Sequence, residues 1–197
     1  MSAPSSAAGD RGGGPPRSAG TVLGRAAPGR AGLRSVLGRF ATGVTLVSAG
    51  RETPCGMTAN AFTSVSLEPP LILVCVDRSA AIYKTVLSAG SFAVSMLSSR
   101  QEHVARHFAD HSRPRGADEF SAFEWSPGPS TGAPILDGAI AWLECALTTS
   151  YEGGDHEIFI GSVLASGFGP TADALLFFSG GFHQPPLAKS RTIEGWA

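Results

Sequence analysis

The chain has 197 residues and a formal net charge of −1, with 43% hydrophobic and only 16% charged residues. This length and balance fit one domain with a real core rather than a disordered chain. The near-neutral charge, without a basic stripe, argues against nucleic acid as a partner. No apolar run approaches membrane-spanning length, so we predict no transmembrane helix.

Residues 1–32 are rich in Gly, Ala, Pro, Ser and Arg and hold almost no large apolar residue before Val22. Such a segment buries too little surface to offset its ordering entropy, so it predicts a disordered extension. No apolar segment follows the arginines, which excludes a signal peptide; a transit peptide is the alternative to flexible padding. We predict one domain over 33–187 and a tail over 188–197.

The first half of the domain predicts short helices among strands. A helix is expected from Leu33 with Gly43 as its stop, then a strand over 44–49. The apolar run 71–76 predicts a strand buried on both faces. Residues 80–90 predict a helix and 91–97 an alternating strand, and a capping box at Ser98 or Ser99 opens a helix over 100–111.

The second half predicts a long ordered loop and then strands. Residues 112–135 are rich in Pro and Gly, with Phe120, Phe123 and Trp125 as anchors. Residues 139–166 predict two long strands joined by a glycine turn, and 174–183 a last strand. Many strands, few helices and no regular βαβ alternation predict a mostly antiparallel barrel or sandwich.

The three cysteines, Cys55, Cys75 and Cys145, are odd in number and widely spaced. This pattern is typical of reduced thiols in a cytoplasmic protein rather than of disulfides or a zinc site. Cys75 and Cys145 lie in apolar runs, where a thiol behaves as a small hydrophobe. Cys55 adjoins a polar stretch, which leaves a reactive role open beside the favoured structural one.

Histidines offer two patterns. His103, His107 and His111 are spaced by four, as zinc ligands on one helix face are, but neither a glutamate in the metalloprotease position nor a nearby cysteine accompanies them. We therefore predict a solvated helix face and no metal. His156 follows a glycine turn at the mouth of a hairpin, and its position alone leaves chemistry and simple turn closure equally open.

Neutral hydrogen-bonding side chains crowd the stretch "GMTANAFTSVSLEPPLILVCV", which begins at Gly56. A flavin ring is flat and apolar with a polar edge, and holding it takes a few placed hydroxyl and amide groups on an apolar wall. Thr58, Asn60, Ser64 and Ser66 supply such groups. Asp77-Arg78-Ser79 then offers a guanidinium and a hydroxyl suited to a phosphate. The alternative is a polar edge strand beside an ordinary arginine.

Five segments in series resemble the flavin reductase-like domain family, the small NAD(P)H:flavin oxidoreductases of two-component flavin-dependent monooxygenases. They are "RFATGVTLVSA", "GMTANAFTSVSLEPPLILVCVDRSA", "GSFAVSML", "AIAWLECAL" and "GGDHEIFIGSV", and the resemblance runs from about Leu33 to His183. It implies an FMN-binding split β-barrel, Greek-key-like, that forms a cytoplasmic homodimer. Such a protein takes hydride from NADH or NADPH onto FMN or FAD, and a separate monooxygenase receives the reduced flavin.

The resemblance also implies site residues. His156 matches a histidine near the nicotinamide, and the flavin contacts match Thr58, Ala59, Asn60, Ser64, Val65, Ser66, Asp77, Arg78, Ser79, Phe108 and Ala109. No residue is expected to act as an acid or base, because hydride transfer requires mainly stacked rings. Few cations are expected near the cofactor phosphates, so the flavin should leave as a co-substrate.

One departure concerns the last strand, where the family often has two arginines and this chain has Phe178-Ser179-Gly180-Gly181-Phe182-His183. The preference between NADH and NADPH therefore stays open. Two rival hypotheses are a flavin-binding or haem-binding carrier or sensor on the same barrel, and an enzyme like pyridoxamine-phosphate oxidase on a related barrel. The second would require more basic residues, to bind the phosphate of its substrate, than the sequence contains.

Overall fold

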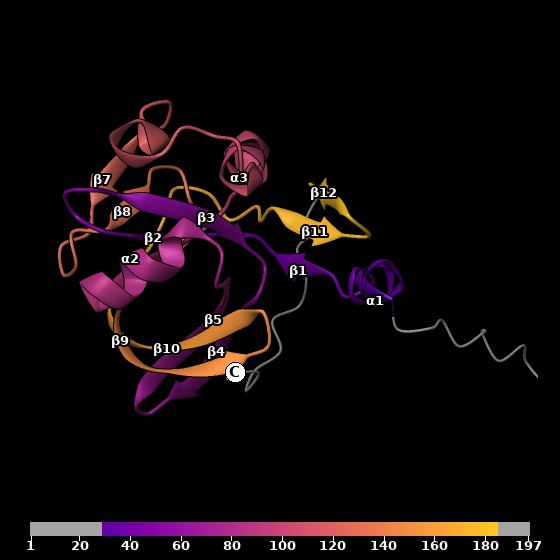
Figure 1. Ribbon diagram of the computed structural model, residues 1–197. Helices are drawn as coiled ribbons and strands as arrows, with labels where there is room; N and C mark the ends of the chain where they lie inside the picture. Colours follow the sequence, from indigo (N-terminus) through magenta and orange to yellow (C-terminus); the bar gives the residue numbers. More distant parts are fainter. Residues whose placement is uncertain (1–28, 185–197) are drawn as a thin grey trace, which may run out of the picture.

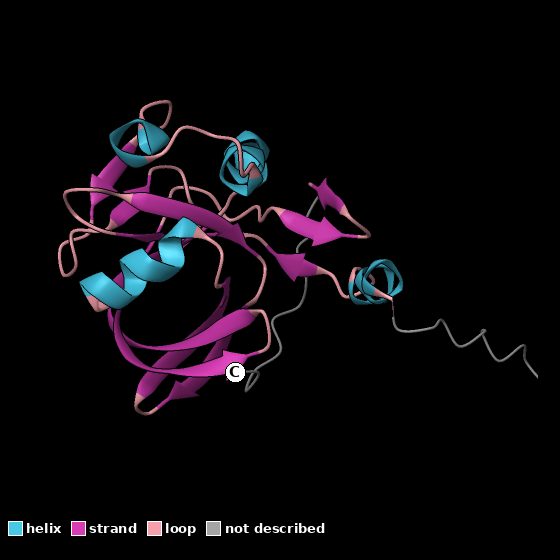
Figure 2. Ribbon diagram, in the orientation of Figure 1, coloured by secondary structure: helices cyan, strands magenta, loops and turns pink. Residues whose placement is uncertain are grey.

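Strands dominate the computed structural model, which describes residues 29–184 (Figure 2). Its helices are α1 (Arg30–Leu37), α2 (Ala81–Ala89) and α3 (Glu102–Ala109), with 3-10 turns η1 (Ser99–Gln101) and η2 (Gly116–Phe120). The strands are β1 (Thr42–Gly43), β2 (Thr45–Ala49), β3 (Cys55–Ala59), β4 (Phe62–Leu67), β5 (Pro70–Asp77), β6 (Ser91–Met96), β7 (Trp125–Pro127), β8 (Pro134–Leu136), β9 (Ala141–Gly153), β10 (His156–Phe168), β11 (Leu176–Phe178) and β12 (Gly181–His183).

Seven strands form one antiparallel sheet in the order β3-β2-β6-β9-β10-β5-β4. Its two edge strands, β3 and β4, are consecutive in the chain, with only Asn60 and Ala61 between them. A flat sheet of this size is roughly 29 Å wide, whereas the two-residue link spans only about 10 Å. The sheet therefore curls and brings the end of β3 to the start of β4, as Figure 1 shows. The predicted split barrel is confirmed.

The long hairpin β9–β10 forms much of the barrel wall and confirms the predicted pair of strands. Their register breaks at Ile160/Gly161 and at Val163/Ala165, and such bulges add the bend that barrel closure requires. At Gly161 a Cβ atom would lie 2.7 Å from the ring of Phe92 and 2.8 Å from Cβ of Cys145. Only glycine fits where this strand crosses the core.

Strand β5 alternates in burial along its length. Ile72, Val74 and Val76 are buried, whereas the residues between them are half-buried. The prediction that both faces are buried is therefore wrong for this chain. The physical reason is that β5 lies in an antiparallel barrel, where only one face points into the core.

Helices α2 and α3 begin and end much as their sequences predict. Ile82 and Val86 of α2 pack into the main core cluster, and Gly90 ends the helix in the left-handed region with φ of 63°. A capping box forms at Ser98, whose backbone N–H donates to the Gln101 side chain at 3.0 Å. Helix α3 packs against β3.

Helix α1 differs from the prediction at both ends. It begins at Arg30, within the segment predicted to be disordered, and it ends before Gly38 rather than at Gly43. Thr42 and Gly43, which the helical spacing predicted as the end of the helix, instead form a strand that pairs with β11. No residue of α1 is buried. The rest of the predicted extension and tail, 1–28 and 185–197, lies outside the described residues.

The predicted long loop contains η2 and the β7–β8 hairpin, and its aromatic anchors are confirmed. Phe120 is buried in a second core cluster, against which Phe123 and Trp125 pack. The last predicted strand is a hairpin, β11–β12, that joins β1 in a separate small sheet. Among the helices of the described residues, none has the length and apolar character needed to span a bilayer.

Candidate functional site

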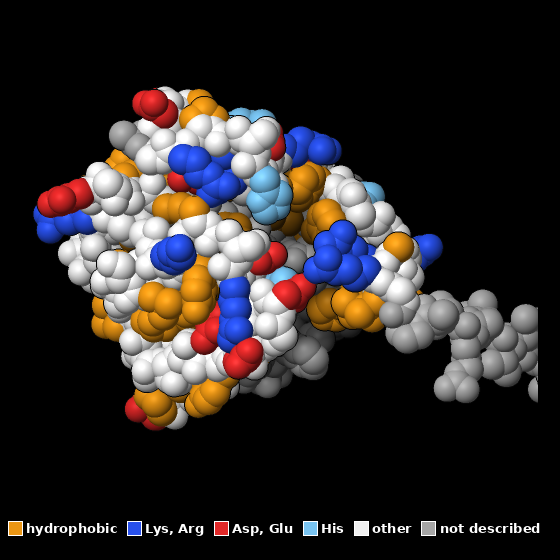
Figure 3. All heavy atoms as spheres, viewed as in Figure 1, with side chains coloured by type: hydrophobic (Ala, Val, Ile, Leu, Met, Phe, Trp, Pro, Cys, Tyr) orange, Lys and Arg blue, Asp and Glu red, His pale blue; other side chains and the backbone are white. Residues whose placement is uncertain are grey.

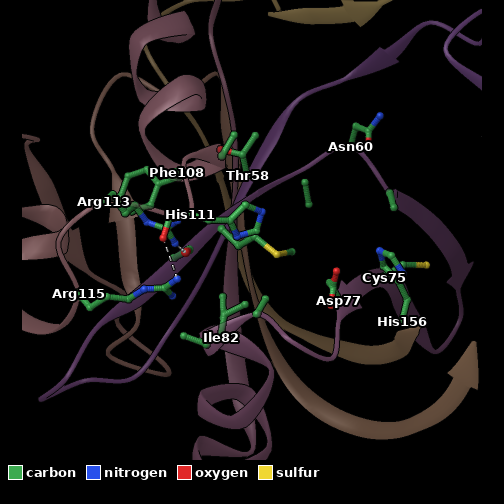
Figure 4. A pocket seen from close by; sticks show the side chains of 17 residues that line it. Thr58, Asn60, Cys75, Asp77, Ile82, Phe108, His111, Arg113, Arg115 and His156 are labelled. Atoms are coloured by element: carbon green, nitrogen blue, oxygen red, sulfur yellow. Dashed lines mark hydrogen bonds between the residues drawn. The ribbon is translucent and has the colours of Figure 1, made fainter. Parts of the chain in front are cut away.

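A cavity of about 240 Å³ opens where the two edges of the barrel meet (Figure 4). Three segments form it: β3 with the link to β4, the end of β5 with the start of α2, and the end of α3 with the loop that follows. His156 of β10 closes one side. The lining residues are Gly56, Met57, Thr58, Ala59, Asn60, Ala61, Cys75, Asp77, Ala80, Ala81, Ile82, Phe108, Ala109, His111, Arg113, Arg115 and His156.

The edge of β3 that pairs with no other strand faces this cavity. Strand β3 is an edge strand, paired only with β2, and both the N–H and the C=O of Gly56 bond outward, to side chains of Glu119 and Arg113. Backbone groups alternate in direction along an antiparallel strand, so those of Thr58 point to the same side as those of Gly56. One wall of the cavity thus carries the backbone N–H donor and C=O acceptor of Thr58, beside the bonded groups of Gly56.

The side chain of Thr58 is partly committed to the fold. Its hydroxyl donates to the backbone carbonyl of Ala105 in α3 at 2.7 Å, so toward a ligand it can only accept. The Asn60 side chain is exposed, and it has no hydrogen-bond partner among the described residues. Of the predicted hydroxyl and amide groups that line the cavity, the amide of Asn60 is therefore the one that makes no hydrogen bond within residues 29–184.

The apolar wall comes from α3. Phe108 is buried, with its ring centroid 4.8 Å from that of Phe120. A Cβ atom on Gly56 would lie 2.8 Å from the Phe108 ring, so glycine is required where β3 passes these aromatics. Phe108 and Ala109, which the resemblance implies as flavin contacts, both line the cavity.

The predicted phosphate loop divides into a part inside the cavity and a part outside it. Asp77 lines the cavity, and its carboxylate accepts hydrogen bonds from the N–H and hydroxyl of Ser79, both at 2.7 Å. These bonds hold the pKa of Asp77 below its usual range. Arg78 points elsewhere, donating to Glu157 at 2.8 and 3.0 Å and to Glu152 at 2.9 Å. Neither Arg78 nor Ser79 lines the cavity.

Ser64, Val65 and Ser66 lie on β4 and do not line the cavity either. The register between β4 and β5 breaks between Ser64 and Ser66, which leaves Val65 as an unpaired bulge residue, 48% exposed. In one copy of the chain, then, these three residues face outside the cavity that Thr58 and Asn60 line.

His156 stands at the first position of β10, opposite Asp77 in register, and lines the cavity. Its Nδ1 lies 2.8 Å from a carboxylate oxygen of Asp155. Hydrogen bonds from His156 and then Arg30 lower the pKa of Asp155, so this carboxylate accepts and Nδ1 carries the proton. In the neutral ring Nε2 is left as an acceptor. The ring thus bonds a side chain rather than the backbone of its turn.

Two of the three spaced histidines do not lie on a solvated helix face. His111 lies beyond the end of α3 and lines the cavity. His107 packs with its ring 4.8 Å from that of Phe123, and its Nε2 lies 3.1 Å from the carbonyl oxygen of Glu119. That part of the prediction is wrong because the loop after α3 folds back over the helix. Within residues 29–184 no group of His, Cys, Asp and Glu could hold a metal ion.

Sequence reasoning missed the basic residues of this loop. His111, Arg113 and Arg115, at alternate positions, all line the cavity, so the expectation of few cations does not hold. Their signal was the run "HSRPR", which begins at the last residue of the helix predicted over 100–111. Met57, Cys75 and the first residues of α2 were also missed.

Arg113 anchors the loop to β3. Its guanidinium donates to Glu119 at 2.8 Å, to the carbonyl of Asp110 at 2.8 Å and to the carbonyl of Gly56. The side chains of Arg113 and Glu119 are only 6% and 1% exposed. The charge of Arg113 is therefore balanced inside the protein, and the pair fixes the loop over the cavity.

A larger cavity of about 430 Å³ lies beside η1 and the first turn of α3, lined by residues such as Gln101, His103, Leu136 and Asp137. It contains none of the predicted site residues. The first cavity gathers seven of them: Thr58, Ala59, Asn60, Asp77, Phe108, Ala109 and His156. Apolar walls with a hydrogen-bonding edge suit a flat ring with polar groups along one side, so the residues present fit a flavin.

Comparison with known proteins identifies the family of this chain. The family model described as "Flavin reductase like domain" matches residues 37–186. An NADH-dependent FAD reductase from Streptomyces globisporus is 50% identical over 79% of this chain and 85% of its own length. The reductase subunit of a flavin-dependent monooxygenase from Mycobacterium tuberculosis is 32% identical, over 76% of this chain and 79% of the relative.

Two solved structures are similar as well. The flavin reductase component of a bacterial two-component tryptophan halogenase has a TM-score of 0.76 and 49% identity, covering 79% of this chain and 98% of that one. The NADH:FAD oxidoreductase of Streptomyces globisporus C-1027, solved in complex with NAD and FAD fragments, has a TM-score of 0.77 and 46% identity, covering 82% and 95%. The chain belongs to the flavin reductase-like domain family.

Proposed function

We propose that this protein uses NADH to reduce FAD and passes the reduced flavin to a separate monooxygenase. It is an NAD(P)H:flavin oxidoreductase. The observation that carries this function is the cavity at the meeting edges of the barrel, with the free edge of β3 on one wall and His156 on another. The names of the relatives support the choice of NADH and FAD.

When bound, a flavin supplies a ring that accepts a hydride from a reduced nicotinamide. The chain's part is to hold and orient the rings, since the transfer depends on near-attack geometry. The backbone N–H of Thr58 bonds the polar edge of the ring, where preorganised donors favour developing negative charge. Phe108, Ala109 and Met57 exclude water. His156, fixed by Asp155, orients the nicotinamide without transferring a proton.

The remaining predicted contacts belong to the same proposal. Ser64, Val65, Ser66, Arg78 and Ser79 act on parts of the nucleotide that extend beyond the cavity, Arg78 on a part other than the phosphate. A cavity of about 240 Å³ is smaller than the 300–1,000 Å³ typical of sites that enclose a ligand, so a dinucleotide must extend outside it. The reductase domain spans 33–187, close to the matched range.

We also propose a homodimer. Helix α1 buries none of its residues, and Leu33, Val36, Leu37 and Phe40 are 53–75% exposed. Leu67 of β4 and Phe168 of β10 are exposed too. Hydrophobic side chains gather over α1 and near the tip of the β4–β5 hairpin (Figure 3). Exposed apolar residues in such number are typical of an association surface, and a second copy is the proposed occupant. The three unpaired cysteines support a cytoplasmic location.

The test is an activity matrix of two nucleotides and two flavins with the purified protein. We expect NADH oxidation only after FAD or FMN is added, fastest with NADH and FAD. Boiled protein and flavin without protein serve as controls. Tightly bound flavin without turnover would instead indicate a carrier or sensor, and no oxidation in any of the four pairings would refute the proposed activity.

A further inference from the structure

The cavity has an uneven distribution of charge. On one side Asp77 carries a carboxylate and adjoins His156. On the other side lie His111, Arg113 and Arg115, from the loop after α3, as Figure 4 shows. A bound molecule with one anionic arm would therefore take a single orientation, with that arm toward the loop.

Arg78, the residue whose guanidinium the sequence predicts for a phosphate, is poorly placed for this role. It makes three hydrogen bonds to the two carboxylates of Glu152 and Glu157. One guanidinium against two carboxylates leaves a net charge of −1 in this cluster, which repels a phosphate. Arg113 is also committed, because it is buried against Glu119.

Arg115 has the guanidinium that can bind a phosphate. It is exposed and lines the cavity, and it forms no salt bridge within residues 29–184. Its one hydrogen bond there is a long one, 3.4 Å, from Nη2 to the carbonyl of His111. The buried side chain of Arg113, two residues before it and two after His111, holds both neighbours over the cavity.

A helix start also borders the cavity. Ala81 and Ile82, the first residues of α2, line it, and no side chain caps the helix at Ala80. Uncapped N–H groups at a helix start attract anions. With the guanidinium of Arg115, which forms no salt bridge in the described part of the chain, they make the cavity complementary to a phosphate.

We propose that Arg115, assisted by His111, binds a phosphate group of the nucleotide held in the cavity. This inference rests on the proposed function, because it takes a flavin or pyridine nucleotide as the ligand. Both carry phosphate, and the experiment separates them. The neutral end of the ligand then lies toward Asn60 and His156.

The test compares ligands with and without phosphate. Equilibrium binding of FMN and riboflavin is followed by quenching of flavin fluorescence, and binding of NADH and dihydronicotinamide riboside by nicotinamide fluorescence. Arg115→Ala should weaken binding of a phosphate-bearing ligand roughly tenfold, the effect expected from one charge-assisted hydrogen bond, and leave its phosphate-free counterpart unchanged. His111→Ala should show a smaller loss, and Arg115→Lys should restore part of the affinity. Higher salt should shrink the difference.

Arg51→Ala is the matched control, since Arg51 is an exposed arginine in the β2–β3 turn that does not line the cavity. Loss confined to FMN assigns the phosphate to the flavin, and loss confined to NADH assigns it to the pyridine nucleotide; either supports the proposal. Equal weakening of FMN and riboflavin, or no weakening at all, would overturn it. The binding measurements require no turnover. They therefore test the phosphate site even if the protein oxidises no nucleotide in the activity matrix.

Discussion

The three thiols of this chain differ in their surroundings. Burial first, and then the neighbouring Glu119, raise the pKa of Cys55 to about 11. Burial also raises the pKa of Cys145 to about 12. Since the thiolate is the reactive form, both side chains should be inert near neutral pH, and the structural role favoured for Cys55 agrees with this. Cys75 is half-buried and lines the cavity.

We therefore predict that iodoacetamide labels Cys75 first in the native protein, and slowly, because burial raises its pKa as well. Saturating FAD should slow this labelling at least severalfold, since the ligand covers the cavity wall. Peptide mass spectrometry over a time course would measure both rates, with Cys75→Ser as the control. Labelling of Cys55 before Cys75, or no protection by flavin, would contradict the placement of the site.

At the level of elements, the loop after α3 depends on one buried ion pair. Arg113 and Glu119 join this loop to both backbone groups of Gly56, so they fix β3 and the cavity wall together. The guanidinium also lies 5.5 Å from the centroid of the Phe108 ring. Removing one partner leaves a charge buried without compensation, which costs far more than the loss of an exposed pair.

Arg113→Ala should lower the free energy of unfolding by about 3–5 kcal/mol. The control is Arg30→Ala, which breaks the exposed pair with Asp155 and should cost less than about 1 kcal/mol. Urea unfolding followed by circular dichroism compares the two. Similar losses in both variants would show that the buried pair does not anchor the loop.

Local sequence predicted the elements whose signals are local. The capping box at Ser98, the stop at Gly90 and the glycine turn before His156 each depend on residues a few positions apart. The half-exposure of β5 depends on its neighbours in the barrel, and the early end of α1 on pairing with β11, so neither could be read from a short window. In the candidate site, the cavity wall formed by β3 could be predicted from the polar residues of the stretch that begins at Gly56. For the cation at Arg115 the run "HSRPR" was a signal, but it could not single out this arginine. Arg78 is neutralised by carboxylates far from it in the sequence, at Glu152 and Glu157, and Arg113 by Glu119, which only the fold buries.

In the whole molecule, the candidate site lies where the barrel is least completely closed. The edge strands β3 and β4 are joined by a two-residue link, and the unpaired edge of β3 faces a cavity rather than another strand. Helix α2 lies beside this opening, with Ala81 at the cavity and Ala89 at its far end, both exposed. A bulky side chain at Ala81 would fill the cavity without entering the core, whereas the same change at Ala89 would not reach it.

The central claim is that NADH reduces flavin in this cavity. Its most direct test is an anaerobic stopped-flow mixture of protein, FAD and NADH, following loss of the visible absorbance of oxidised flavin. The account predicts that wild type and Ala89→Trp bleach the flavin completely, and that Ala81→Trp slows this step roughly a hundredfold because the rings lose near-attack geometry. Flavin reduction by Ala81→Trp at the wild-type rate, with the fold and flavin supply unchanged, would contradict it.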